Sequence, residues 1–181
     1  MALSSVVALG ALVAPMQASA QDPEPGAGKG RVVGIEHRTV GIVRRVESIS
    51  GDIRTEESPE QVEVTLAADV LFAFDQADLS PEAAARIDEV AGQIKASATG
   101  PVAIVGHTDA KGTDAYNADL SLRRAAAVRD ALSAKAPGIG FEVSGKGAAD
   151  PVAPNTKEDG SDDPDGRARN RRVTITFARK G

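Results

Sequence analysis

The sequence predicts an α+β fold, a two-layer sandwich in which two helices pack on a small mixed sheet in the order βαβαββ. Three observations predict it. Residues 62–66 and 172–178 alternate apolar and polar side chains, as half-buried strands do. Residues 84–94 and 118–132 repeat apolar or small residues at spacings of 3 and 4, the period of an amphipathic helix. Residues 102–105 form a short apolar run between chain-breaking residues, which indicates a buried strand. Because each helix has one apolar stripe, both should cover one face of the sheet.

The composition argues against several classes of function. The 181 residues include 21 Lys and Arg and 26 Asp and Glu, so the net charge of −5 disfavours nucleic-acid binding. The chain has no cysteine and two histidines, so we expect no disulfide, no thiol catalysis, no metal site and no cofactor. Aromatic residues make up 3% and tryptophan is absent, so stacking platforms for bases or sugars are scarce.

Residues 1–20 are typical of an export signal. This segment has no charged side chain, and its apolar run 6–13 precedes the small residues Ala18-Ser19-Ala20. We therefore expect cleavage after Ala20 and a mature protein in the periplasm, cell wall or cell surface. The apolar run is too short to span a bilayer, and no later segment is apolar enough, so no integral membrane span is expected. The alternative is a buried N-terminal helix.

The chain divides by composition into three parts after the signal. Residues 21–30 are rich in Pro and Gly and predict a linker. Residues 31–61 form a short β-rich segment, in which 31–49 predicts a weak hairpin and 50–60 a polar turn. Residues 62–181 should form the main domain.

Within the main domain, strand 62–66 is followed by the apolar residues 70–74, which we expect to be buried. Ser80-Pro81-Glu82 predicts a helix start, with a Ser cap, Pro at the first helical position and an acid in the first turn. This helix should end before Gly100-Pro101. Its predicted core stripe is Ala84, Ile87, Ala91 and Ile94.

A second helix should begin at Thr113 or Asp114 and end near Lys135. Its predicted core stripe is Ala118, Ser121, Ala125, Val128 and Leu132. A strand over 141–145, a long loop over 149–166 and a strand over 172–178 complete the order. In the last strand Val173, Ile175 and Phe177 should face the core.

Candidate binding residues lie at strand ends and on the second helix. Seven residues make about two helical turns, so Asn117 and Arg124 share one face. The loop that carries Asp109 leads directly into this helix, so we expect Asp109 and Arg124 to meet. An acid beside an arginine complements a zwitterion, because the carboxylate suits an ammonium and the guanidinium suits a carboxylate. The alternative is a salt bridge that only locks the loop to the helix.

A catalytic interpretation of His107, Asp109 and Ser121 is disfavoured, because Ser121 falls on the core stripe and no strained nucleophile turn is visible. We therefore expect no enzyme. The loop 158–166 has five acids, a composition that calcium favours, but Pro164 interrupts it and a solvated acidic loop is the alternative.

The C-terminal region has a cluster of four arginines of the kind found in nucleic-acid-binding patches: Arg167, Arg169, Arg171 and Arg172. The acidic residues that precede them offset their charge. In a strand, Arg169 and Arg171 would point one way and Arg172 the other. The alternative places one of the four in the groove beside Asp109.

Several ordered motifs resemble one family. Residues 108–124 match T-D-x-x-G-x(4)-N-x-x-L-S-x-x-R. Upstream stand Leu71-Phe72-x-Phe74-Asp75 and Leu79-Ser80, and downstream Gly145-x-Gly147, Pro151, Asn155 and the run G-R-A-x-N-R-R-V at 166–173. Over about residues 62–179 the chain thus resembles the OmpA-like C-terminal domain.

The resemblance implies a non-catalytic module that binds peptidoglycan. It assigns Asp109 and Arg124 to the diaminopimelate of the stem peptide. It places Asp75, Asn117, Leu120 and Arg171 along the same groove. Two alternatives remain open: a secreted adaptor of the same fold that docks an envelope protein, and a calcium-dependent structural module.

Overall fold

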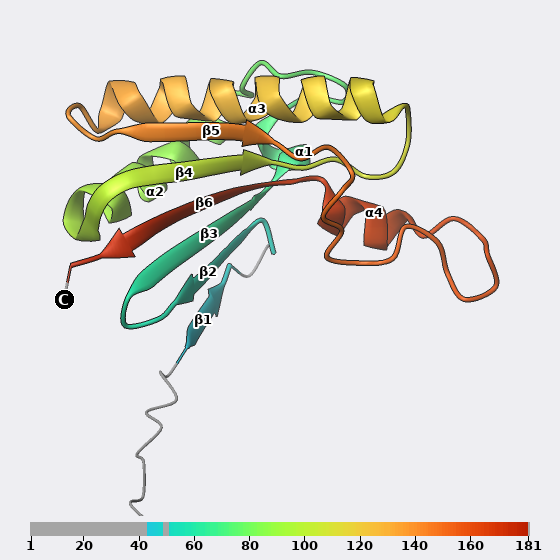
Figure 1. Ribbon diagram of the computed structural model, residues 1–181, viewed down its shortest axis with the longest axis horizontal. Coiled ribbons are helices and arrows are strands. Elements are labelled where there is room, and N and C mark those ends of the chain that lie inside the picture. Colours follow the sequence, from blue (N-terminus) through green and yellow to red (C-terminus); the bar gives the residue numbers. More distant parts are fainter. Residues whose placement is uncertain (1–42, 49–50, 181) are drawn as a thin grey trace, which may run out of the picture. The chain divides into compact units, whose positions relative to one another are not determined.

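The computed structural model describes residues 43–48 and 51–180, which build one mixed sheet and four helices. The strands are β1 (Arg44–Glu47), β2 (Ile53–Glu57), β3 (Gln61–Ala67), β4 (Ala98–Gly106), β5 (Phe141–Gly145) and β6 (Arg172–Arg179). The helices are α1 (Ala68–Leu71), α2 (Ala83–Ser97), α3 (Asp114–Lys135) and α4 (Pro164–Asn170). The strands lie in the order β1-β2-β3-β6-β4-β5, as Figure 1 shows. Only the β4–β5 pairing is parallel among them.

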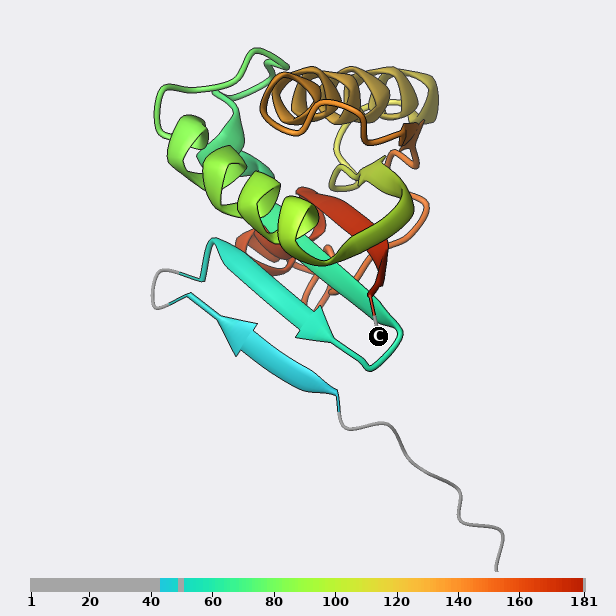
Figure 2. The same ribbon diagram turned by 90° about the vertical axis from the view of Figure 1, so that its left-hand side faces the viewer.

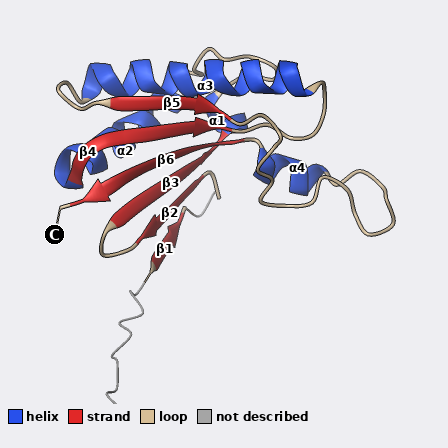
Figure 3. Ribbon diagram, in the orientation of Figure 1, coloured by secondary structure: helices blue, strands red, loops and turns tan. Residues whose placement is uncertain are grey.

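The two-layer α+β fold is confirmed. Helices α2 and α3 lie on the same side of the sheet, which Figures 2 and 3 show from two directions. The core forms between these helices and the central strands. One row of it runs across the sheet, because Val64 on β3 and Ile104 on β4 both pair with Ile175 on β6, and all three are fully buried. Their burial fits the apolar–polar alternation of the strands.

The polar segment 50–60 is not the turn that its composition predicts. It contains β2, which pairs with β1 on one side and β3 on the other. Ile53 and Thr55 are buried, while Arg54 and Glu56, which alternate with them, form cross-strand ion pairs with β1. The predicted boundary between 61 and 62 therefore falls inside one continuous sheet. Residues 1–42, with the predicted signal, linker and first part of the hairpin, lie outside the described residues.

The prediction that residues 70–74 are buried is half wrong. Leu71 and Phe72 are buried, but Phe74 is 95% exposed. The chain turns just after it, since Asp75 has φ 59°, in the left-handed region that side chains other than glycine seldom adopt. This turn directs the chain out of the core.

Helix α2 begins at Ala83, two residues after the start that the capping signal predicts, and its buried face is rotated. The Ser80 hydroxyl accepts a hydrogen bond from the Ala83 N–H at 3.1 Å, in the turn that leads into the helix. The buried residues are Ala83, Ile87, Val90, Ala91 and Ile94, whereas Ala84 is exposed. In α3, Ala118 is likewise exposed, while the other four residues of the predicted stripe are buried.

Helix α2 ends at Ser97, before Gly100-Pro101 as predicted, but these two breaker residues do not bound the strand that follows. Gly100 and Pro101 lie inside β4, where the pairing with β6 shifts register between Thr99 and Ala103. The end of the predicted loop 149–166 is also helical, because α4 starts at Pro164. The Asp163 side chain accepts a hydrogen bond from the Gly166 N–H at 3.0 Å and caps that helix. Asp163-Pro164-Asp165 is thus the same start signal as Ser80-Pro81-Glu82.

No helix within residues 43–48 and 51–180 has the length and hydropathy needed to cross a membrane.

Close approach of α3 to β4 predicts a sharp effect of Gly106→Ala. A Cβ on Gly106 would lie 2.1 Å from the backbone oxygen of Ser121, so α3 would have to move off the sheet. We expect the free energy of unfolding to fall by about 2–3 kcal/mol in urea denaturation.

Gly92→Ala in α2 is the matched control, since a Cβ there meets nothing within 4 Å. It is expected to raise stability by about 0.5–1 kcal/mol, because alanine favours a helix interior. Equal effects of the two substitutions would contradict the close approach.

Candidate functional site

A groove of about 470 Å³ opens between the α1–α2 loop, the end of β4, the start of α3 and α4. We call it the Asp109 groove. It is lined by Asp69, Phe72, Ala73, Phe74, Asp75, Thr108, Asp109, Lys111, Tyr116, Asn117, Leu120, Arg124, Arg167 and Arg171. All six residues predicted for the site, Asp75, Asp109, Asn117, Leu120, Arg124 and Arg171, are among them.

Local structure explains how the chain delivers these side chains. β4 ends at Gly106, and the buried residues that follow it lead to Asp109 at the floor of the groove. Thr113 then caps α3, because its hydroxyl accepts a hydrogen bond from the Tyr116 N–H at 3.3 Å. The first three turns of α3 present Asn117, Leu120 and Arg124 as one buried face, as their spacing predicts.

Asp109 is held by two arginines of the C-terminal region. Its Oδ2 accepts hydrogen bonds from Nη1 of Arg171 at 2.9 Å and Nη1 of Arg167 at 3.2 Å. Its Oδ1 accepts one from the Lys111 N–H at 3.0 Å. Burial alone would raise the pKa of Asp109, but these hydrogen bonds outweigh it and hold the pKa below the ordinary 3.8. The carboxylate therefore stays charged at physiological pH.

The expected contact between Asp109 and Arg124 is not formed, which corrects the sequence-based expectation. The Arg124 Nε donates instead to the Gln76 carbonyl at 2.8 Å, and its guanidinium lies over the Phe72 ring at 5.2 Å. None of the ion pairs between described residues includes Arg124, although it is only 5% exposed. Burial lowers the pKa of Arg124, and Asp69 and Asp75 oppose that shift. The groove thus contains a buried cation that has no carboxylate bound to it within the described chain.

Arg167 and Arg171 reach the groove because α4 and its C-cap place them one turn apart. Each also binds a second carboxylate in a two-point contact. Arg171 binds Asp69 at 2.9 and 2.6 Å, and Arg167 binds Asp162 at 2.8 and 2.6 Å. Hydrogen bonding to Asp69 raises the pKa of Arg171 further above its ordinary value. These contacts form one side wall of the groove.

Sequence reasoning missed several lining residues. Arg167 could have been found, because the Asp-Pro-Asp start signal predicts a helix in which 167 and 171 share a face. Thr108 has a buried hydroxyl without a hydrogen-bond partner, and no local pattern reveals this. Tyr116 donates its hydroxyl to Asp75 Oδ1 at 2.5 Å, and this bond raises the tyrosine pKa.

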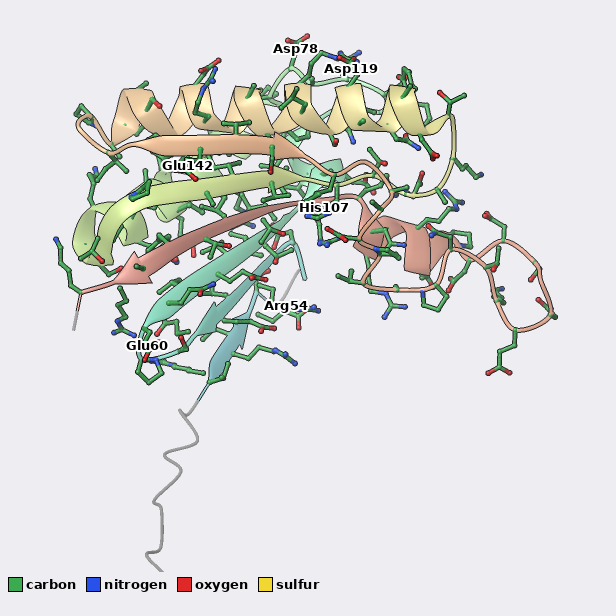
Figure 4. All side chains as sticks on the ribbon, in the orientation of Figure 1. Arg54, Glu60, Asp78, His107, Asp119 and Glu142 are labelled. Atoms are coloured by element: carbon green, nitrogen blue, oxygen red, sulfur yellow. The ribbon has the colours of Figure 1, made fainter. Side chains whose placement is uncertain are left out.

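His107, Asp109 and Ser121 do not line a common cavity in the described structure. The Ser121 hydroxyl is fully buried, donates to the Ala118 carbonyl and accepts from the Gly147 N–H, both at 2.9 Å. His107 lies with Arg54 in a second groove on the sheet face opposite α3 (Figure 4). Burial, reinforced by Arg172, lowers the pKa of His107 to about 4.

Three of the five acids of loop 158–166 make local contacts. Asp159 accepts hydrogen bonds from Ser161, Asp162 binds Arg167, and Asp163 caps α4. No cluster of three or more acidic or histidine side chains placed to bind a metal occurs among residues 43–48 and 51–180.

Arg169 lies in α4 and not in a strand, so the expected strand alternation of Arg169, Arg171 and Arg172 is wrong. Arg172 is buried and donates to the carbonyls of Asn170 and Asp150. Of these three arginines, Arg171 alone lines the Asp109 groove.

Comparison with known proteins identifies relatives of this chain. The chain is 34% identical over 178 residues to a Gloeobacter violaceus protein named photosystem I P700 chlorophyll a apoprotein A2, a match covering 81% of this chain and 20% of that protein. It is 41% identical over 121 residues to outer membrane protein A of Bordetella avium, covering 65% of this chain and 58% of that protein. The chain thus spans between a fifth and about three fifths of these curated relatives.

Among solved structures, the cell wall anchor of the T6SS from Pseudomonas aeruginosa aligns with a TM-score of 0.63 and 32% identity. The alignment covers 72% of this chain and 90% of that one. The family model described as the OmpA family matches residues 71–171, more than half of the chain, and includes every predicted site residue. This chain belongs to the OmpA family.

Proposed function

We propose that this protein is a non-catalytic cell-envelope protein that binds peptidoglycan and grips the diaminopimelate of the stem peptide in the Asp109 groove. The observation that carries the proposal is the pair of opposite charges lining this groove. Arg124 is a buried cation to which no carboxylate of the described residues is bound, and Asp109 is a charged carboxylate that is 8% exposed. Membership of the OmpA family and similarity to a structure titled a cell wall anchor support it.

The chemistry of the ligand matches these two groups. Diaminopimelate carries an ammonium and a carboxylate on its distal carbon. The guanidinium of Arg124 suits the carboxylate, because its planar N–H groups can bind both oxygens. Asp109 suits the ammonium, while Arg167 and Arg171 hold the aspartate in place. The unpaired Thr108 hydroxyl supplies a further hydrogen-bonding group in the same groove.

The other predicted residues shape the groove around that contact. Asn117 donates to the Asp109 carbonyl at 3.4 Å, and Leu120 is a buried apolar residue on the same face of α3. Asp75 and Arg171 stand on other elements that line the groove. We assign all four to positioning of the stem peptide.

The proposed location is outside the cytoplasm, after cleavage following Ala20. The charge-free segment 1–20 supports export, and a curated relative bears the name outer membrane protein A. The mature chain would then begin with the linker at residue 21.

Competition on isolated sacculi tests the proposed ligand. Free meso-diaminopimelate is expected to displace the protein at concentrations at least 10-fold below those needed for Nα-acetyl-lysine amide. This blocked lysine offers an ammonium at the end of its side chain but no carboxylate for Arg124, and a charge-assisted contact contributes about 1.5–3 kcal/mol. The measurement is the fraction of protein that sediments with sacculi at rising competitor concentration.

Pimelate, which has the two carboxylates but no ammonium, is the complementary competitor and tests the Asp109 half of the contact. Equal displacement by diaminopimelate and Nα-acetyl-lysine amide, or displacement by neither, would overturn the zwitterion mechanism. Failure of the protein to sediment with sacculi at all would overturn the proposed function.

A further inference from the structure

The aromatic residues of this chain are concentrated at one place. It has four Phe, one Tyr and no Trp. Phe72, Phe74 and Tyr116 all line the Asp109 groove, and only Phe141 and Phe177 lie elsewhere. A chain so poor in aromatic residues thus has three of its five at the proposed ligand site.

The three aromatic residues differ in their exposure. Phe72 is buried beneath the Arg124 guanidinium and belongs to the core. Phe74 is 95% exposed and Tyr116 is 42% exposed. No described part of this chain covers the Phe74 ring, although leaving an apolar ring exposed to water costs free energy. The two exposed rings belong to separate elements, the α1–α2 loop and α3, which lie side by side in Figures 1 and 2.

Backbone conformation fixes this exposed position. Asp75, next to Phe74, has φ 59°, a conformation that is costly for a residue with a side chain. The Tyr116 hydroxyl binds the Asp75 carboxylate at 2.5 Å and ties the turn to α3. The Arg124 Nε binds the carbonyl of Gln76, the next residue, at 2.8 Å. The loop is therefore held by two groove residues in a shape that leaves Phe74 outside the core.

We propose that Phe74, with Tyr116 beside it, is a stacking platform for a sugar ring of the glycan that carries the stem peptide. This inference rests on the proposed function, because the peptide gripped in the groove is covalently attached to that glycan. A sugar ring presents a face of C–H groups, and a phenyl ring without polar atoms packs on such a face. The platform would make the site specific for glycan-linked peptide over free peptide, although the scarcity of aromatic residues argued against any sugar contact.

Two chemically matched probes test this assignment by calorimetry. The first is the free tripeptide L-Ala-γ-D-Glu-meso-diaminopimelate. The second is the same tripeptide attached to the disaccharide N-acetylglucosaminyl-N-acetylmuramic acid. Wild-type protein is expected to bind the disaccharide-linked probe about 3- to 10-fold more tightly, the range of one aromatic stacking contact.

Phe74→Ala is expected to abolish this preference and leave the Kd of the free tripeptide unchanged. Phe74→Trp should retain the preference, because it keeps a flat apolar face. Leu122→Ala, which removes an exposed apolar side chain of α3 outside the groove, is the control and should behave as wild type. The high exposure of Phe74 predicts an unaltered melting temperature for both Phe74 variants.

Each other result identifies what fails. If wild-type protein binds both probes equally, the sugar platform is wrong and the groove assignment stands. The same holds if Phe74→Ala lowers the affinity for both probes by the same factor. An unaltered preference in Phe74→Ala also overturns the platform and leaves Phe74 as a surface for another partner. If wild-type protein binds neither probe, the proposed function fails, and the platform fails with it.

Discussion

Arg124→Ala is expected to weaken binding to sacculi by about 30- to 1000-fold, the effect of removing one partner of a buried charge-assisted contact. Arg124 lies in the groove with 5% exposure and binds no carboxylate of the described chain. Its charge is therefore available to a ligand carboxylate. The measurement is the Kd for the disaccharide-linked tripeptide, with sedimentation on sacculi as the second readout.

Stability should change far less than binding. Alanine removes the contact of Arg124 with Phe72 and the hydrogen bond to the Gln76 carbonyl, so we expect a loss of about 1–2 kcal/mol in the free energy of unfolding. Arg124→Lys keeps the charge but lacks the planar fork, so its binding should lie between wild type and alanine.

Arg123→Ala is the matched control, because it is the same substitution one position earlier on α3. The Arg123 side chain is half exposed and pairs with Asp119 at the helix surface, an interaction that contributes little. It should leave the Kd unchanged. If Arg124→Ala binds with wild-type affinity, Arg124 is not part of the binding site. If both variants lose affinity equally, the cause is a general charge effect.

Asp109→Asn is expected to reduce affinity by a similar factor and also to destabilise the fold. Asparagine keeps the shape of the side chain but loses the charge that the ligand ammonium needs. It also leaves Arg167 and Arg171 without the carboxylate they share, which should lower the free energy of unfolding by about 1–3 kcal/mol. Calorimetry and urea denaturation on the same preparations separate the two effects.

The pH dependence of stability gives this variant a second readout. The pKa of Asp109 is lower in the folded protein than its ordinary 3.8, so its contribution to stability is complete above pH 3.8. It is lost as the pH falls below 3.8 through the folded-state pKa. Wild-type protein should therefore lose more stability below pH 3.8 than Asp109→Asn. The exposed carboxylate of Asp119 provides the control Asp119→Asn, which should match wild type in binding.

A loss of stability without a loss of binding in Asp109→Asn would identify the aspartate as a structural group that only holds α4. The reverse result, weaker binding with unaltered stability, would show that its two arginines find other partners.

Much of the fold could be predicted because buried faces repeat along the chain. Residues 62–66 and 172–178 alternate, and they form the paired strands β3 and β6. The start of α3 at Asp114 follows from its Thr113 cap. Strand β2 could not be predicted in this way, since Ile53 is its only large apolar residue. This segment is a strand because its backbone pairs with β1 on one side and β3 on the other, and the local pattern does not show this pairing.

Part of the groove was also readable from the sequence, but its contacts were not. Asn117, Leu120 and Arg124 share a face because the helical repeat requires it, and the loop from β4 brings Asp109 to the start of that helix. The partners of Asp109 come instead from 58 and 62 residues further along the chain, on α4 and at its C-cap.

The sequence by itself therefore determined the α+β class, the two covering helices and the shared face of Asn117 and Arg124 on α3, because each depends on spacing between near neighbours. The resemblance to the OmpA-like domain, and not spacing, brought Asp75 and Arg171 into the predicted site. Only the tertiary structure decided which arginine binds Asp109, which remains available to a ligand, and that Phe74 stands in solvent. These outcomes depend on competition. Arg167 and Arg171 reach the Asp109 carboxylate, whereas Arg124 packs on Phe72 and binds the carbonyl of Gln76. Such a competition is settled by distances that the folded topology sets, and no local pattern contains them.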